Sequence, residues 1–455
     1  MKYKKSYYNI EVDKKETGEI LLFNSVSTAY GVIRAENAKI YENLEFFDDN
    51  NTDNLCENEK SLYKTLIENR FLVEDGYKEK EFVKLTERFY RYNSENQEIS
   101  LTIAPTSNCN MDCPYCYEKK NTKKMDEKVK SQLVNFVKSI CANAKGLRIA
   151  WYGGEPLLEL DTIRELSNEF VKFCTEKNIN YRPSIITNGV LLTKDIATIL
   201  VDECKIQSAQ VTIDGLNDIH NNRRRLVDKS MKSFDIITNN IEEVKGLLHI
   251  NVRINIDKEN SIYIDDILKY LIEKQWVQKN GITFYFAPVH GMEEAGNYGI
   301  HRCFDWKEFG ELESYIVRKM NEYEVYDSLR MFYPRPLPIS CGALTPSYFV
   351  VGPEGELYKC WNYVGNESKI IGSIFDGTKM NDEFTNWLLL DSPKECCECK
   401  SYPVCRGGCP AERFTNGNKP ACSHRKISNN ERLKLIYDNY KNKPEEDKVC
   451  ETCSV

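Results

Sequence analysis

The chain of 455 residues lacks three features that mark secreted, membrane and nucleic-acid-binding proteins. Its first 20 residues contain no apolar signal segment, and no stretch approaches the ~18 consecutive apolar residues of a membrane-spanning helix. A net charge of −7 is spread along the chain without a basic block, which argues against a nucleic-acid partner. We therefore expect a cytoplasmic protein with no membrane partner.

Cysteine, in contrast, is abundant, with 18 residues, of which eight lie in the last 60 positions. Without a secretory signal, this number argues against a disulfide framework and for metal ligation in a reducing compartment. Hydrophobic residues make up 41% of the chain and charged residues 29%, as in ordinary globular domains. The length favours two or three such domains.

The middle of the chain, from about residue 100 to residue 290, alternates strand-like and helical segments. The clearest helical apolar spacing covers 126–144, and a second helix is expected near 159–176. Near-continuous apolar strands separated by helices predict an α/β fold in which helices cover a parallel sheet. The predicted strands are 98–106, 147–154, 183–189, 209–215, 249–257 and 282–290.

A loop of three cysteines follows the first predicted strand. Cys109, Cys113 and Cys116 have the spacing C-x3-C-x2-C within CNMDCPYC. Iron–sulfur cubanes normally take four cysteines, so three thiolates would leave one iron open for another ligand. The alternatives are a zinc site or unligated thiols, but structural zinc usually has a second cysteine pair, and this loop has none nearby.

Glycines follow the second predicted strand, in the segment Gly153-Gly154-Glu155-Pro156. Glycine lets the backbone approach a ligand closely. Alone the segment is a weak turn signal, but it lies one βα unit after the cysteine loop. Together the two motifs resemble the radical S-adenosylmethionine (radical SAM) enzymes.

This resemblance implies a partial (β/α)6 barrel with its chemistry at the carboxyl ends of the strands. It also implies that a 4Fe–4S cluster on the three cysteines binds S-adenosylmethionine through its open iron. Reductive cleavage of that cofactor would yield a 5′-deoxyadenosyl radical, which abstracts a hydrogen atom from the substrate. Cys109, Cys113 and Cys116 are therefore the expected catalytic ligands.

The resemblance also places residues around the cofactor. Tyr115 would lie near the adenine, and Glu155 or neighbouring backbone carbonyls would accept hydrogen bonds from the methionine ammonium. Arg224 would bind the cofactor carboxylate, although a triple-arginine run is as often a solvated face. The expected cofactor-binding residues are Tyr115, Gly153, Gly154, Glu155, Pro156, Thr187, Asn188, Thr212, Asp214 and Arg224.

A second set of cysteines occupies residues 341–422. Its spacing, which includes Gly355, matches the SPASM extension, which in relatives carries two auxiliary 4Fe–4S clusters; a pair of zinc ribbons is the alternative. The resemblance assigns the outer cluster to Cys396, Cys399, Cys405 and Cys422. It assigns the inner cluster to Cys341, Cys360 and Cys409.

The inner set departs from fully ligated relatives, which have a fourth cysteine shortly before the first. Residues 331–340 contain none. Either Cys303 supplies the fourth ligand or the inner cluster has an open iron. We favour the open iron, which could receive a substrate cysteine thiolate.

The expected domains are 1–95, 96–330, 331–430 and a charged tail, 431–455. The first should contain a hairpin within 17–33 and a helix running into a strand within 61–76. It resembles a winged-helix-like α+β domain that recognises peptides, and a structural cap on the barrel is the alternative. Cys450 and Cys453 form either a redox or metal-binding arm or a pair of exposed thiols.

These features predict a maturase of an anaerobic organism that installs a cysteine thioether crosslink in a ribosomally synthesised precursor peptide. Its electron donor would be a flavodoxin or ferredoxin. Alternatives are a sulfatase-maturating enzyme that forms formylglycine, a carbon–carbon or carbon–oxygen crosslinking enzyme, and a non-catalytic metal scaffold. Sulfatase-maturating enzymes place an acidic residue directly after the inner-cluster cysteine, where this chain has Trp361.

Overall fold

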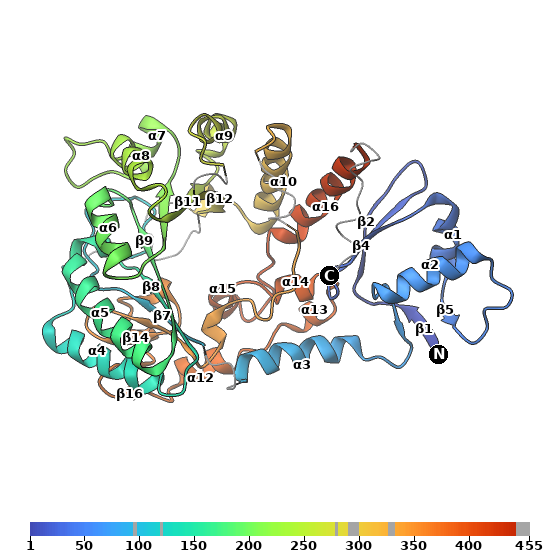
Figure 1. Cartoon of the computed structure of the whole chain (residues 1–455), viewed down its shortest axis with the longest axis horizontal. Coiled ribbons are helices and arrows are strands. Elements are labelled where there is room, and N and C mark those ends of the chain that lie inside the picture. Colours follow the sequence, from blue (N-terminus) through green and yellow to red (C-terminus); the bar gives the residue numbers. More distant parts are fainter. Residues whose placement is uncertain (94–97, 119–121, 278–280, 290–299, 326–332, 443–455) are drawn as a thin grey trace. The chain divides into compact units, whose positions relative to one another are not determined.

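The computed structural model describes residues 1–93, 98–118, 122–277, 281–289, 300–325 and 333–442 (Figure 1). These residues form two compact units. The first comprises the described parts of Met1–Arg91, Trp306–Cys341 and Asp391–Val455, and the second comprises those of Tyr92–Asp305 and Gly342–Leu390. Because both units combine separate segments, the domain boundaries expected from the sequence stay predictions.

The second unit is built around a ten-stranded sheet, in which six neighbouring parallel strands confirm the predicted α/β barrel core. Their order is β12-β11-β10-β9-β8-β7, so chain order and sheet order agree, as in successive β–α units. All six predicted strands are confirmed. Their bounds are β7 Glu98–Ile103, β8 Gly146–Trp151, β9 Asn180–Thr187, β10 Ser208–Ile213, β11 His249–Ile256 and β12 Ile282–Pro288.

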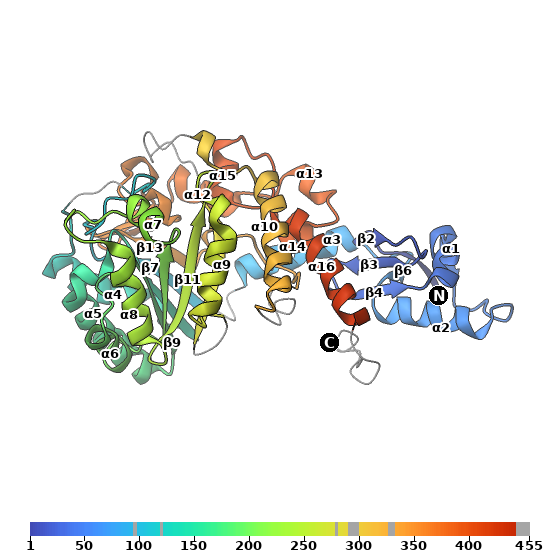
Figure 2. The same cartoon turned by 90° about the horizontal axis from the view of Figure 1, so that it is seen from above.

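Helices cover the outer face of these strands (Figure 2). In α5, Ile163, Leu166 and Phe170 are buried at helical spacing, which places one apolar stripe against the sheet. The predicted helices near 126–144 and 159–176 are α4 and α5. The helices of this unit are α4 Glu127–Ile140, α5 Leu160–Lys177, α6 Lys194–Asp202, α7 Asn217–Arg223, α8 Ser233–Val244, α9 Ile264–Glu273 and α12 Asp382–Leu389.

The sheet continues beyond β7 with strands from the cysteine-rich part of the chain, which the sequence did not predict. Strand β13 pairs in parallel with β7, with Tyr348 opposite Ser100 and Val351 opposite Ile103. Cys360 lies two residues after β14, so a strand of this same sheet sets its position. The added strands are β13 Tyr348–Val351, β14 Glu356–Tyr358, β15 Gly372–Ser373 and β16 Gly377–Thr378.

The first unit has the predicted α+β character. Two antiparallel sheets have the orders β5-β1-β6 and β2-β3-β4. The expected hairpin is β3 and β4, and the expected helix and strand are α2 and β6. The strands are β1 Lys2–Lys5, β2 Asn9–Lys14, β3 Ile20–Asn24, β4 Tyr30–Ile33, β5 Phe46–Asp48 and β6 Leu72–Glu74.

Helices from the last part of the chain complete this unit. Leu433 and Tyr437 of α16 pack on Phe23 and Tyr30, and the Tyr30 hydroxyl donates to the Leu433 carbonyl at 2.8 Å. The N-terminal strands therefore share a core with residues near 430. The helices are α1 Ala35–Asn43, α2 Glu57–Glu68, nearly all of α3 Glu79–Tyr92, α10 Trp306–Glu322, α13 Lys394–Cys397, α14 Tyr402–Cys405, α15 Pro410–Thr415 and α16 Arg425–Asn442.

The remaining cysteines of the barrel are core residues. Cys141, Cys174 and Cys204 are buried in or next to helices, as predicted for packed side chains. Cys450 and Cys453 lie outside the described residues. No helix of the described ranges is long and apolar enough to cross a membrane.

Candidate active site

The carboxyl ends of β7 to β11 bring most of the expected cofactor residues into one region of the second unit. Parallel strands present their carboxyl ends at one edge of the sheet, where loops can meet. The cysteine loop follows β7, and the Gly-Gly-Glu segment follows β8. Thr187 ends β9, and Asp214 follows β10.

The three loop cysteines lie in one neighbourhood. Burial raises the pKa of the Cys109 thiol to about 12, and Cys113 and Cys116 are close enough to raise it further. The Met111 amide donates to Cys109 Sγ at 3.4 Å, and the Cys116 amide donates to the Cys113 carbonyl at 3.2 Å. Three mutually destabilising thiolates fit a cationic iron cluster, which would remove their repulsion.

A single metal ion would require a different arrangement of the cysteine thiolates. Zinc draws thiolates to about 2.3 Å from one centre, whereas the cysteines of a cubane bind separate irons. Among the residues that the structure describes, no three His, Cys, Asp or Glu side chains are placed to hold one ion.

The Gly-Gly-Glu segment lies directly against the cysteine loop. The Gly154 amide donates to the Thr106 carbonyl at 3.2 Å, and the Glu155 amide donates to the Asn108 carbonyl at 2.8 Å. A Cβ atom at Gly154 would lie 2.2 Å from the Asn108 carbonyl oxygen, which is closer than real atoms approach. Glycine here therefore serves the packing of two backbones.

Glu155 connects two strand ends. Its carboxylate is fully buried and accepts hydrogen bonds from Thr187 Oγ1 at 2.7 Å, the Asn188 amide at 2.8 Å and the Leu157 amide at 3.0 Å. Burial raises its pKa, and these donors oppose the rise. These three bonds leave Oε2 about one further lone pair, so Glu155 or a neighbouring backbone carbonyl can accept from a ligand ammonium.

Asn188 extends this connection to the cluster loop. Its Nδ2 donates to Asn110 Oδ1 at 2.7 Å and lies 4.0 Å from Cys109 Sγ. The loops after β7, β8 and β9 are thus joined by hydrogen bonds. Pro156 begins a short 3-10 helix behind the Gly-Gly-Glu segment, and Thr212 is buried near the end of β10.

Arg224 joins Tyr115 to the end of β10. Its Nη1 donates to the Tyr115 hydroxyl at 2.8 Å and lies 4.0 Å from Asp214 Oδ1. Arg224 is 9% exposed, so it is not part of a solvated face, whereas the side chain of the next residue, Arg225, is 52% exposed. The structure places Tyr115, Asp214 and Arg224 together, and their contacts with the cofactor stay a prediction.

Asp214 has capacity for a ligand. It is fully buried, and Arg223, Arg224 and Tyr115 lie near its carboxylate. The two arginine nitrogens lie at 3.4 Å and 4.0 Å. A carboxylate has about four lone-pair positions, so this one can also accept hydrogen bonds from hydroxyl or ammonium groups of a ligand.

Sequence reasoning missed Arg223 and Asp257. Arg223 Nη1 donates to Asp257 Oδ2 at 2.7 Å, and the guanidinium carbon lies 5.4 Å from the centre of the Tyr115 ring. Asp257 follows β11 directly, so its position at a strand end was the available signal. Cys303 lies near both side chains, which act on its pKa.

A second polar group in this unit was also missed. The hydroxyls of Tyr117 and Tyr152 form a hydrogen bond, and Glu118 contacts Tyr152. Burial raises the pKa of Glu118 to about 7. The ring of Trp361 lies 5.9 Å from that of Tyr152. The residue after Cys360 thus approaches the end of β8, beside the residues that follow the cysteine loop.

The four cysteines assigned to the outer cluster lie together in the first unit. Burial raises the pKa of Cys396 to about 12, and the other three are close enough to raise it further. Positive φ angles at Gly407 and Gly408, +79° and +78°, turn the chain between the last two cysteines of the C-x2-C-x5-C-x3-C run. The four are Cys396, Cys399, Cys405 and Cys422.

The inner-cluster cysteines belong to both units. Cys341 and Cys409 are part of the first unit, and Cys360 is part of the second. Their joint ligation of a cluster stays a prediction, as does the choice between Cys303 and an open iron. No disulfide involves the sixteen cysteines that the structure describes.

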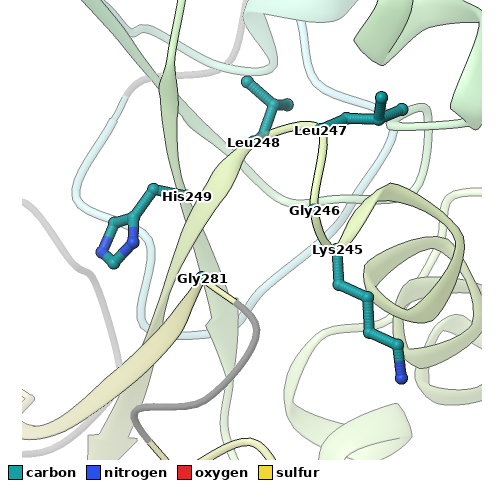
Figure 3. A pocket seen from close by; sticks show the side chains of 6 residues that line it. All are labelled: Lys245, Gly246, Leu247, Leu248, His249 and Gly281. Atoms are coloured by element: carbon teal, nitrogen blue, oxygen red, sulfur yellow. The ribbon is translucent and has the colours of Figure 1, made fainter.

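The surface depression in Figure 3 lies elsewhere. Its lining includes Lys245, His249 and Gly281. His249 begins β11 and Gly281 precedes β12, so these residues lie at the amino ends of the strands. Chemistry in such sheets occurs at the carboxyl ends, and we assign this depression no role.

Comparison with known proteins identifies the class. Residues 103–271 match the radical SAM superfamily. The matched range contains the cysteine loop, the Gly-Gly-Glu segment, Asp214 and Arg224. The chain therefore carries a radical SAM domain, and the protein is a radical SAM enzyme, a class that uses a 4Fe–4S cluster and S-adenosylmethionine.

Two curated relatives extend beyond this domain. A cysteine-type anaerobic sulfatase-maturating enzyme of Clostridium novyi is 28% identical over 352 residues, covering 70% of this chain and 91% of that enzyme. The radical SAM cyclopropyl synthase TigE of Paramaledivibacter caminithermalis is 24% identical over 435 residues and covers 87% of both chains.

Two solved structures share the fold. Native anSMEcpe with bound AdoMet and Cp18Cys peptide has a TM-score of 0.58 at 23% identity, covering 75% of this chain and 98% of that one. Streptococcus suis SuiB bound to precursor peptide SuiA has a TM-score of 0.50 at 16% identity, covering 94% and 99%. They confirm the predicted fold class.

The contact between the Gly-Gly-Glu segment and the cysteine loop predicts a specific loss of iron. We expect Gly154→Ala to displace Asn108 and Cys109, because the new Cβ would overlap the Asn108 carbonyl. Reconstituted protein should lose about four irons per chain, one cubane, as measured by iron and sulfide analysis. Gly76→Ala is the control, because nothing lies within 4 Å of its added Cβ. Full iron content in Gly154→Ala would contradict the prediction.

Proposed function

We propose that this enzyme is a peptide maturase that forms a cysteine thioether crosslink in a ribosomally synthesised precursor. The single observation that carries the proposal is the approach of Trp361 to Tyr152. It brings the segment that contains Cys360 near the end of β8, where the cofactor residues gather. A substrate cysteine held near Cys360 would then lie close to the region where the radical forms.

The residues of the second unit have separate tasks in this proposal. Cys109, Cys113 and Cys116 would hold the cluster, and Tyr115, Asp214 and Arg224 would hold S-adenosylmethionine. When bound, these groups would supply a 5′-deoxyadenosyl radical that abstracts a hydrogen atom from a carbon of the peptide. The barrel strands would orient the peptide and exclude water.

Peptide binding is supported by the neighbours. The anSMEcpe structure contains a bound peptide, and the SuiB structure contains a precursor peptide. The SuiB likeness covers 94% of this chain and so extends over the N-terminal α+β region. We propose that this region recognises the precursor and that a flavodoxin or ferredoxin supplies electrons.

Formylglycine formation is the second candidate, because the sulfatase-maturating relative has the higher identity of the two. Trp361 disfavours it, because an indole cannot accept a proton where the resemblance expects an acidic side chain. The name of TigE points to ring closure between carbons, and this chemistry would be the third candidate.

Mass spectrometry separates the candidates. After anaerobic incubation with the enzyme, S-adenosylmethionine and a reductant, a cysteine-containing precursor encoded beside this gene should lose about 2 Da per crosslink. Alkylation of free thiols distinguishes a thioether, which consumes one thiol, from a carbon–carbon bond, which consumes none. A loss of about 18 Da would instead establish formylglycine.

Arg224 should control cofactor binding. We expect Arg224→Gln to weaken S-adenosylmethionine binding by at least about tenfold, or 1.4 kcal/mol, because it removes a buried charge that contacts Tyr115 and lies near Asp214. Equilibrium dialysis of the reconstituted protein would measure it. Arg182→Gln is the control and should bind as the native enzyme does, because Arg182 is 48% exposed and pairs with Glu98 at the amino end of β7. Equal affinities of the two variants would argue against this site.

The inner cluster should respond to substrate. We propose that Cys341, Cys360 and Cys409 hold it and leave one iron for a peptide thiol, because residues 331–340 contain no further cysteine. Mössbauer spectra should show one distinct iron site that changes on adding the cysteine-containing precursor. A precursor with serine in place of cysteine is the control. Spectra that the cysteine peptide leaves unchanged would favour a fully ligated cluster.

A further inference from the structure

Several arginines are buried in the first unit, which also contains the outer-cluster cysteines. Arg413 is fully buried, and Arg91 and Arg406 are each 4% exposed. Arg413 lies on α15, between two of the outer-set cysteines in sequence, and Arg91 lies on α3. A buried charge is tolerated only when it is paired or hydrogen-bonded. The partners of these guanidiniums therefore indicate what the site is built to hold.

Two of the arginines share one carboxylate. Glu87 lies 3.4 Å from Arg91 Nη2 and 3.9 Å from Arg406 Nη1, and it accepts a hydrogen bond from the Tyr402 hydroxyl. Arg406 also donates to the Val83 and Leu337 carbonyls. Glu87 is thus already engaged by neighbours other than Arg413.

The hydrogen bonds of Arg413 go to neutral groups, and the charge of Glu87 only partly opposes the fall in the pKa of Arg413 that burial causes. Its Nε donates to Asn418 Oδ1 at 3.1 Å, and its Nη2 donates to the Asp391 carbonyl oxygen. Its Nη1 is buried and makes no hydrogen bond with any described residue. A buried charged donor without an acceptor is costly, so this atom points to an anionic partner other than the described side chains.

Arg413 Nη1, the donor without an acceptor, lies near Cys396. A Cβ atom at Gly407 would lie 3.4 Å from Arg413 Nη1 and 3.7 Å from Cys396 Sγ. Both atoms therefore lie within 4 Å of one point beside Gly407, the position that a Cβ atom would take. Burial raises the pKa of Cys396, and the positive charge of Arg413 opposes that rise.

An iron–sulfur cluster supplies the missing anion. A cubane with four thiolates carries net negative charge, which increases when the cluster takes up one electron. Hydrogen bonds to its sulfurs and charges nearby set its reduction potential. A buried cation that donates to a sulfur stabilises the reduced form more than the oxidised form, and so raises the potential.

We propose that Arg413 Nη1 donates a hydrogen bond to a sulfur of the outer cluster and raises the reduction potential of that cluster. The step is a one-electron reduction by a low-potential donor, in which no bond forms or breaks. Arg413 is a positioning and tuning residue that touches neither peptide nor S-adenosylmethionine. The inference rests on the proposed assignment of the outer cluster to Cys396, Cys399, Cys405 and Cys422.

The experiment is a redox titration followed by electron paramagnetic resonance. It uses the full chain with Cys109, Cys113 and Cys116 replaced by alanine, so that only auxiliary clusters contribute. Arg413→Gln keeps a hydrogen-bond donor and removes the charge, and Arg413→Lys keeps the charge. Arg432→Gln is the matched control, because Arg432 is buried in the same unit but pairs with Glu313 at 2.7 Å.

We expect the midpoint potential of one auxiliary component to fall by about 59 mV in Arg413→Gln, a tenfold change for one electron. The midpoint potential should fall by less than half as much in Arg413→Lys, and it should not change in Arg432→Gln. An assembled cluster with an unchanged potential in Arg413→Gln would overturn the inference.

Loss of the outer cluster in the Arg413 variants would also test the inference. Loss of the outer cluster in Arg413→Gln and its retention in Arg413→Lys would support the inference, because both variants change the packing and only one removes the charge. Loss in both variants would overturn it in favour of a structural role. If the chain with native Arg413 held no auxiliary iron and sulfide, the cluster assignment itself would fail, which is a distinguishable result.

Discussion

The site in the second unit depends on one backbone contact, in which the Gly-Gly-Glu segment lies against the cysteine loop. Two amide-to-carbonyl hydrogen bonds join the loops after β7 and β8, and no side chain fits between them. Glu155 then carries the connection to the end of β9 through Thr187 and Asn188. A three-cysteine loop has few contacts of its own, so its geometry is set by these neighbours.

The two cysteine sites differ in the buried charged residues around them. Around Tyr115, the buried Arg223 and Arg224 face the carboxylates of Asp214 and Asp257, so opposite charges alternate at the strand ends. Near the outer cysteines, in contrast, Arg91 and Arg406 share the carboxylate of Glu87, and Arg413 has no carboxylate within ion-pair distance among the described residues. The first arrangement suits a zwitterionic ligand such as S-adenosylmethionine, and the second suits an anion.

The sequence predicted those parts of the structure that depend on residues close together in the chain. Apolar runs predicted the six barrel strands, and cysteine spacing located both thiol groups. Long-range pairing was not predictable in this way, because β13 lies beside β7 although Tyr348 and Thr102 are 246 residues apart. The same holds for the contact of Tyr152 with Trp361. Their partners come from segments whose own sequences carry no sign of the pairing.

The pairing of β13 with β7 also has a consequence for dissecting the molecule. Cutting the chain after β12 would expose the β7 edge, with the unpaired backbone groups of a buried, apolar strand. Such an edge is a template for aggregation. We therefore expect residues 103–271, the range that matches the radical SAM superfamily, to aggregate when they are produced alone, because β13 of the cysteine-rich region covers the β7 edge.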